Sequence, residues 1–196
     1  KAGKNGLHAS VGSKTERIDR FYPVFARNMR HLGSPTHSRE WFRAISGHYG
    51  DDCLTGLVEL EGQTVGAGIV LISGTRAAIP WASTLREYNH LAPNMLLYWC
   101  LLEAVVARGC TNFDFGRSGF GEGTYRFKAQ WGARPVPLHW EYARPLSIRR
   151  AYTNTDVAND RPTSRRLRIA AEKVWRRLPL PLTVIVGSRL RPFFSR

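Results

Sequence analysis

The stretch FDFGRSGFGEGTYRFK, from Phe113 to Lys128, carries most of the information on fold and function. Four glycines lie within eight positions, after an apolar run typical of a strand and before a run typical of a short helix. Glycine lets a ligand approach backbone N–H groups, and a helix start adds partial positive charge. The stretch therefore predicts either a ligand-binding loop or a loop whose glycines only serve turns with positive φ.

The segments around this stretch predict helices and strands in a fixed order. Their apolar spacing, turn residues and capping residues indicate four helices and a meander of three antiparallel strands, with two further strands after the third helix. The third helix is apolar enough to predict burial on nearly all sides. This order is typical of an α+β fold. The expected helices cover Thr15 to Leu32, Ser38 to about His48, Asn94 to Arg108 and Thr124 to Trp131; the expected strands cover Cys53 to Leu60, Thr64 to Ser73, Arg76 to Leu85, Thr111 to Phe115 and about Val136 to Tyr142.

The positive charge is concentrated near the C-terminus. The chain has 196 residues, with 29 Lys and Arg against 15 Asp and Glu, and a net charge of +14. From Arg144 onward, 13 basic residues stand against three acidic ones. Such a field favours polyanionic partners, whether nucleic acid, anionic lipid or phosphorylated substrates.

Within this basic segment, apolar positions from Ser164 to Leu178 follow the spacing of one helix face. Pro179 and Pro181 predict a break, followed by a short apolar segment that includes Leu182 to Val186. A basic amphipathic helix of this kind is typical of an anionic membrane surface. The longest apolar run falls far below the roughly 20 residues that span a bilayer. A helix docked on the domain and a tRNA-binding arm are the alternatives.

Cysteine and histidine usage argues against two classes of site. Cys53, Cys100 and Cys110 lie in apolar stretches and cannot all pair, which predicts no disulfide framework and a reducing compartment. No His or Cys spacing matches a metal site, so we expect no metal. The chain begins with a polar, glycine-rich segment unlike a signal peptide and lacks an initiator Met, so we expect it to be part of a longer protein.

Three segments resemble the FemAB-like branch of the GNAT acyltransferase superfamily. They are the stretch from Phe113 to Lys128, the following Trp131-Gly132, and the sequence PVPLHWEY from Pro135. More narrowly, they resemble the FemAB-type proteins linked to exosortase/PEP-CTERM exopolysaccharide systems. The resemblance implies a GNAT fold, a mixed and largely antiparallel sheet flanked by helices. It implies a linker at residues 1–14, the GNAT-like domain at 15–143 and a basic helical tail at 144–196.

FemAB-like enzymes usually contain two such units in tandem, and this chain is similar to the second. The expected partners therefore include an N-terminal GNAT unit of the same protein or a homodimer mate. Characterised relatives move an aminoacyl group from aminoacyl-tRNA to an amine of a peptidoglycan precursor, and other GNAT members use acyl-CoA. The resemblance implies an N-acyltransferase with either donor as co-substrate and no bound cofactor. We expect a lipid-linked, saccharide or peptide acceptor, in the cytoplasm or at the inner face of the cytoplasmic membrane.

The resemblance makes Lys128 the first catalytic candidate, because acyl transfer needs a fixed donor for the developing oxyanion. Tyr125 lies three residues earlier on the same helix face. Glu122, the only acid in the loop, is a candidate acceptor for the amine proton. We expect Arg117 and Lys128 to point into one shared hollow. The expected substrate-binding residues are Arg117, Ser118, Gly121, Gly123, Phe127 and Asn94.

The segment Leu91-Ala92-Pro93-Asn94 departs from the family pattern. Typical GNAT enzymes hold the pyrophosphate of CoA with an Arg/Gln-x-x-Gly-x-Gly/Ala loop at this point, and these four residues cannot form it. The departure argues against ordinary acetyl-CoA use. The alternative function is therefore a non-catalytic module on a GNAT scaffold that binds a membrane surface or a polyanion.

Overall fold

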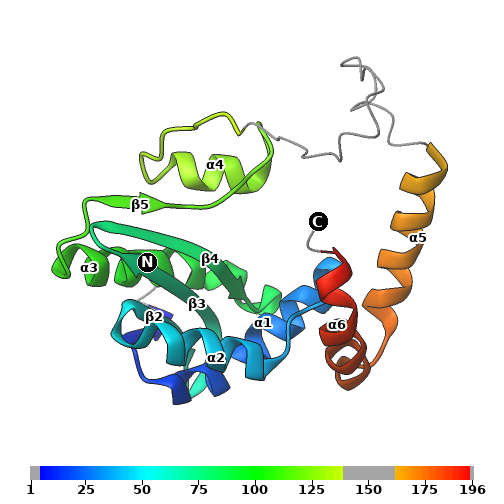
Figure 1. The fold of residues 1–196 in the computed structure, drawn as a ribbon, viewed down its shortest axis with the longest axis horizontal. Helices are drawn as coiled ribbons and strands as arrows, with labels where there is room; N and C mark the ends of the chain where they lie inside the picture. The colour runs from blue at the N-terminus through cyan, green and yellow to red at the C-terminus, as the bar shows by residue number, and fades with distance from the viewer. Residues whose placement is uncertain (1–4, 139–161, 195–196) are drawn as a thin grey trace, which may run out of the picture. The chain divides into compact units, whose positions relative to one another are not determined.

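The computed structural model describes the backbone of residues 5–138 and 162–194 (Figure 1). Its contacts divide the chain into two compact units. The first contains residues 1–117 and 172–196, and the second contains residues 118–171. The first unit holds the sheet and most of the helices.

Five strands form one sheet in the order β1-β2-β3-β4-β5. All neighbours are antiparallel except β4 and β5, which run parallel. This confirms the expected α+β class and the three-stranded meander. Residues 136–138, where a last strand was expected to begin, are not in a strand, and residues 139–142 lie outside the described ranges. The strands are β1 (His8–Gly12), β2 (Cys53–Leu60), β3 (Gln63–Ser73), β4 (Arg76–Thr84) and β5 (Asn112–Asp114).

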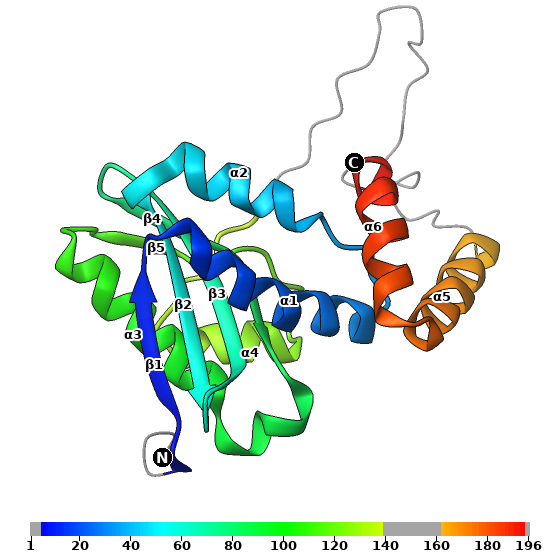
Figure 2. The same cartoon turned by 90° about the horizontal axis from the view of Figure 1, so that it is seen from below.

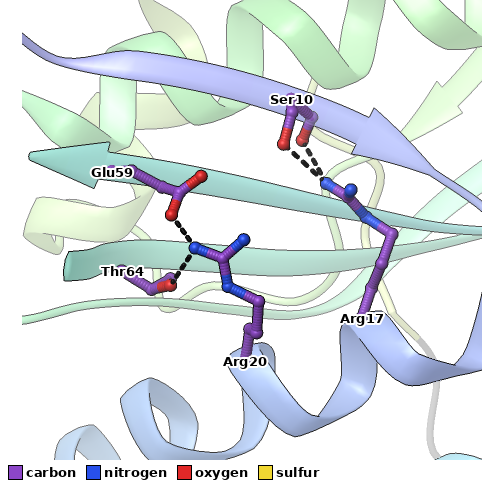
Figure 3. A network of polar contacts seen from close by, with 5 residues as sticks. All are labelled: Ser10, Arg17, Arg20, Glu59 and Thr64. Atoms are coloured by element: carbon purple, nitrogen blue, oxygen red, sulfur yellow. Dashed lines mark hydrogen bonds and ion pairs between the residues drawn. The ribbon is translucent and has the colours of Figure 1, made fainter. Parts of the chain in front are cut away.

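Strand β1 lies inside the segment expected to be a linker. It pairs with β2 from His8 opposite Glu59 to Gly12 opposite Thr55. Arg17, in the short helix η2 (Thr15–Arg17), donates to the carbonyl and hydroxyl oxygens of Ser10 (Figure 3). It also donates to the carbonyl of Thr55. One guanidinium therefore joins the edge strand to its neighbour, and residues 8–12 belong to the sheet.

Helices α1 (Ile18–Leu32) and α2 (Arg39–Tyr49) cover one face of the sheet (Figure 2). Two capping residues behave as their types predict: the Ser38 hydroxyl accepts from the N–H of Trp41, and Gly33 ends α1 with φ 78°. The start expected at Thr15 is wrong, because Thr15 lies in η2 and α1 begins at Ile18 without a side-chain cap. Phe21 and Phe25 stack with ring centroids 5.3 Å apart, and Phe42 meets both rings edge-on. These rings pack on the β2 and β3 side chains that point to the same face.

Helix α3 (Pro93–Ala107) covers the opposite face, where Gly56 and Gly68 form a cross-strand pair. Leu97 and Leu101 rest on this pair, so closely that a Cβ on Gly56 would lie 3.0 Å from both leucines. The expectation that α3 is buried on nearly all sides is wrong. Trp99 is 55% exposed, because only one side of the helix meets the sheet.

The C-terminal helices are α5 (Pro162–Arg177) and α6 (Leu180–Phe194). The expected break at Pro179 separates them, but the apolar segment that follows is helical. In the first unit, Arg30 of α1 donates to the carbonyl of Leu178 at 3.3 Å, and α6 lies beside α1 (Figure 2). None of the helices in the described ranges is both long and apolar enough to cross a membrane.

Candidate functional site

Strands β4 and β5 pair over only three residues, from Arg76 opposite Asn112 to Ala78 opposite Asp114. Strand β4 then continues to Thr84 without β5. Beyond Ala78, no strand of the described residues pairs with this outer edge of β4. A strand edge of this kind can pair with a ligand that lies extended along it.

A bulge in β4 stands where the two strands part. Trp81 pairs with Ile69 and Ala78 pairs with Leu71, so Ile79 and Pro80 together oppose one residue of β3. Proline has no N–H to donate to a ladder, which makes a bulge the favourable place for it within a strand. Such bulges bend a strand and increase its twist, and this turns the second half of β4 away from β5.

The chain leaves β5 through a tight turn. The Asp114 carboxylate accepts from the N–H of Gly116 at 2.7 Å, and Gly116 has φ 72°, a region that favours glycine. Phe115 stacks on Tyr98 of α3, with centroids 5.8 Å apart and the rings nearly parallel. Burial raises the pKa of Tyr98 to about 12, so its hydroxyl stays protonated at neutral pH. Arg117, the residue at which the chain leaves this unit for the second one, is exposed.

The connection from β4 to α3 contains the 3₁₀ segment η4 (Arg86–Leu91). Ala92 then adopts a left-handed conformation with φ 62°, and Pro93 occupies the start of α3. Ala92 provides no side-chain cap for the helix start. Asn94 is half-buried in the first turn. A helix start without a side-chain cap leaves N–H groups that water or a ligand must satisfy.

An aromatic cluster borders the second half of β4, and sequence reasoning missed it. Trp81 meets Trp41 and Phe42 edge-on, with centroids 5.3 Å away in both cases. His37 stacks on Trp41 at 3.8 Å. Trp41 is 37% exposed and can pack on an apolar ligand face. Forty residues separate Trp41 from Trp81, so no local spacing relates them.

The second unit begins at Ser118 and contains α4 (Gly123–Ala129). Glu122 precedes the helix, and its carboxylate accepts from the N–H of Gly119 at 3.3 Å. A Cβ on Gly119 would lie 2.5 Å from that carboxylate, so only glycine fits there without a shift. Gly121 has φ 76°, which explains one glycine of the loop by backbone conformation.

The α4 candidates differ in exposure. Tyr125 and Lys128 are half-buried, as is Phe127, whereas Glu122 and Gly123 are exposed. The Tyr125 ring lies 5.0 Å from that of Phe120, and Phe127 lies 6.2 Å from Trp131. Within the described residues, the Ser118 hydroxyl is buried without a hydrogen-bond partner, an arrangement that a bound ligand can satisfy.

The predicted site thus divides between the two units. Asn94 and Arg117 lie in the first, and the other seven candidates lie in the second. A shared hollow for Arg117 and Lys128 therefore stays a prediction. In the described ranges, no group of three His, Cys, Asp or Glu side chains is arranged to hold a metal ion.

Residues 1–129 match the family model described as an acetyltransferase (GNAT) domain. The chain belongs to this GNAT family. The match places the parted β4–β5 pair and α4 inside an acyltransferase domain, and the five-stranded mixed sheet between helices is the GNAT fold. Among curated protein sequences, none is significantly similar to this GNAT chain.

Solved structures share the fold at low sequence identity. One is an aminoglycoside acetyltransferase, meta-AAC0020, from an uncultured soil metagenomic sample, solved with sisomicin. Its TM-score is 0.57 and its sequence identity is 11%, and the match covers 72% of this chain and 99% of that chain. The aminoglycoside N-acetyltransferase AAC(6')-Iy, solved with CoA, has a TM-score of 0.55 and 12% identity over 71% of this chain and 96% of its own. FemX has a TM-score of 0.55 and 12% identity over 66% of this chain, which spans 50% of FemX.

Proposed function

We propose that this GNAT domain is an N-acyltransferase of the FemAB type. It transfers an acyl or aminoacyl group from an activated ester or thioester to an amine in cell-envelope or exopolysaccharide biosynthesis. The observation that carries the proposal is the parting of β4 from β5 after Ala78 and Asp114, in a chain of this family. An extended acyl donor can pair with the strand edge left open, as an added strand does.

The reaction assigns a task to each candidate residue. The acceptor amine attacks the donor carbonyl, a C–N bond forms, and the C–O or C–S bond breaks as the leaving group departs with a proton. Lys128 donates to the oxyanion that develops on the carbonyl. Tyr125 orients a substrate from the same helix face, and Glu122 is the candidate acceptor for the amine proton, a role that competes with its contact to the N–H of Gly119. Arg117 and the unpartnered hydroxyl of Ser118 bind phosphate or acceptor groups.

The donor is either aminoacyl-tRNA or acyl-CoA. The β4–α3 connection is taken up by η4 and Ala92 rather than by a glycine-rich loop, which weighs against ordinary acetyl-CoA. Parallel assays with charged tRNA and with acyl-CoA, in the full-length native protein, distinguish the two.

Replacement of Lys128 tests the chemistry. We expect Lys128→Ala in the full-length native protein to lower the transfer rate by about 100-fold or more, because one oxyanion donor contributes on that order. Arg126→Ala is the matched control, since Arg126 is an exposed cation on the same helix. Unchanged transfer by Lys128→Ala would remove this residue from the mechanism.

A non-catalytic binding module is the second candidate, favoured by the same missing glycine-rich loop. It predicts that the full-length protein releases neither free CoA nor uncharged tRNA in the presence of amine acceptors. Turnover with either donor above the uncatalysed rate excludes it.

A further inference from the structure

Helix α6 packs one side on the first unit and leaves four aliphatic residues exposed on the other. Thr183 is 2% exposed, and a Cβ on Gly187 would lie 3.0 Å from the backbone nitrogen of Thr36. Leu180 and Val184 also pack against the core. On the outer side, four aliphatic residues are between 36% and 53% exposed. We call these four the α6 stripe: Leu182, Ile185, Val186 and Leu190.

The α6 stripe follows helical spacing, so its side chains lie on one face. A helix that only capped the domain would place its large aliphatic side chains inward and its small or polar ones outward. Here Leu180 and Val184 do pack inward, but the close contact at Gly187 leaves four further aliphatic side chains on the outer side of α6. An exposed group of four aliphatic side chains, with Arg189 among them at helical spacing from Ile185, marks a binding surface.

The charges around the α6 stripe indicate what covers it. Arg189 is exposed next to Leu190 on the outer side of the helix, and Lys173 and Arg177 are exposed on the last turns of α5. Between Glu172 and Phe194 the sequence has five basic residues and one acidic residue. A second copy of this chain would bring two basic segments together, which like-charge repulsion opposes. An anionic surface is complementary to them.

We propose that the α6 stripe lies on an anionic membrane surface. The aliphatic side chains enter the boundary between headgroups and acyl chains, while Arg189, Lys173 and Arg177 contact lipid phosphates. The helix stays attached to the GNAT domain through Thr183 and Gly187, so the whole first unit is held at the surface. This inference does not depend on the transferase chemistry.

Vesicle co-sedimentation of the full chain tests it. The wild type should bind vesicles of phosphatidylglycerol and phosphatidylcholine more tightly than vesicles of phosphatidylcholine alone, with affinity falling as salt rises. Leu182→Ser/Ile185→Ser should weaken that binding by about tenfold or more, since two aliphatic side chains no longer enter the lipid. Met95→Ser/Val106→Ser on α3 is the control, because those residues are also exposed but lie on another helix.

Three results would overturn the proposal: no binding to the anionic vesicles at moderate salt, equal loss in the α3 control, or a dimer in light scattering that the α6 double variant dissociates. Thermal unfolding of each variant checks its folding. Arg189→Gln tests the electrostatic part of the binding separately, because it leaves the four side chains of the α6 stripe unchanged. It should weaken binding only at low salt, and unchanged affinity there also contradicts the proposal.

Discussion

The Nε of Arg191 in α6 donates a hydrogen bond to Nε2 of His37, at a distance of 3.3 Å. The accepting nitrogen must be unprotonated, so this contact requires neutral His37. Burial, and secondly the charge of Arg191, lower the pKa of His37 from 6.5 to about 4. The contact joins the last helix to the segment between α1 and α2, and it links the position of α6 to pH.

Stability should therefore fall in mild acid. Between pH 6.5 and about 4, the unfolded chain protonates His37 while the folded chain does not. The contribution of neutral His37 to the free energy of unfolding is complete above pH 6.5 and is lost as the pH falls toward 4. Because the half-buried ring is partly screened by water, we expect a loss of at most about 2 kcal/mol. Urea denaturation at pH 7, 5.5 and 4.5 measures it.

His37→Phe keeps a ring against Trp41 but cannot titrate, so its stability should change less over this pH range. Arg191→Gln should raise the pKa of His37, because one of the two causes of its depression is removed. An NMR titration of the His37 ring that gave the same pKa in Arg191→Gln and wild type would contradict this account.

The glycine pair beneath α3 should not tolerate a methyl group. A Cβ on Gly56 would lie 3.0 Å from Leu97 and Leu101, so Gly56→Ala should lower the free energy of unfolding by about 1–3 kcal/mol through overpacking. Gly47→Ala in α2 is the opposite case, because nothing lies within 4 Å and alanine favours the helix. It should raise stability by about 0.5–1 kcal/mol. Thermal and chemical unfolding compare the two.

The attachment of β1 should depend on Arg17. Arg17→Met removes donors to Ser10 and Thr55, and we expect a loss of about 1–2 kcal/mol, since each bond comes from a charged donor that is partly solvated. Hydrogen exchange at the amides of residues 8–12 should rise more than exchange in β3. Arg27→Met, at an exposed position on α1, is the control. Equal exchange in both variants would show that β1 is held by its ladder alone.

A conservative substitution can distinguish a structural role of Glu122 from a chemical one. Its carboxylate accepts from the N–H of Gly119, and an amide oxygen in Glu122→Gln can accept the same bond. If the loop contact is its main role, transfer in Glu122→Gln should remain within about threefold of wild type, and this is the result we expect. A loss of about 100-fold in Glu122→Gln with normal stability would instead assign it the amine proton.

Local signals in the sequence predicted much of the fold. Ser38 and Gly33 mark helix ends because a hydroxyl cap and a left-handed glycine act within four residues. The meander was predictable because short turns set the pairing of neighbouring strands. Strand β1 was not, because its five residues are held by β2 and Arg17 rather than by a pattern of their own.

The sequence by itself determined the order of helices and strands, the glycine-rich loop and the basic C-terminal segment, since each depends on residues close together in the chain. Only the tertiary structure decided that β4 parts from β5 at the Ile79–Pro80 bulge, that Trp81 meets Trp41, and that α6 exposes its aliphatic face. Those features depend on which surfaces pack together between segments far apart in the chain. Close packing decides those contacts, and the spacing of neighbouring residues does not specify them.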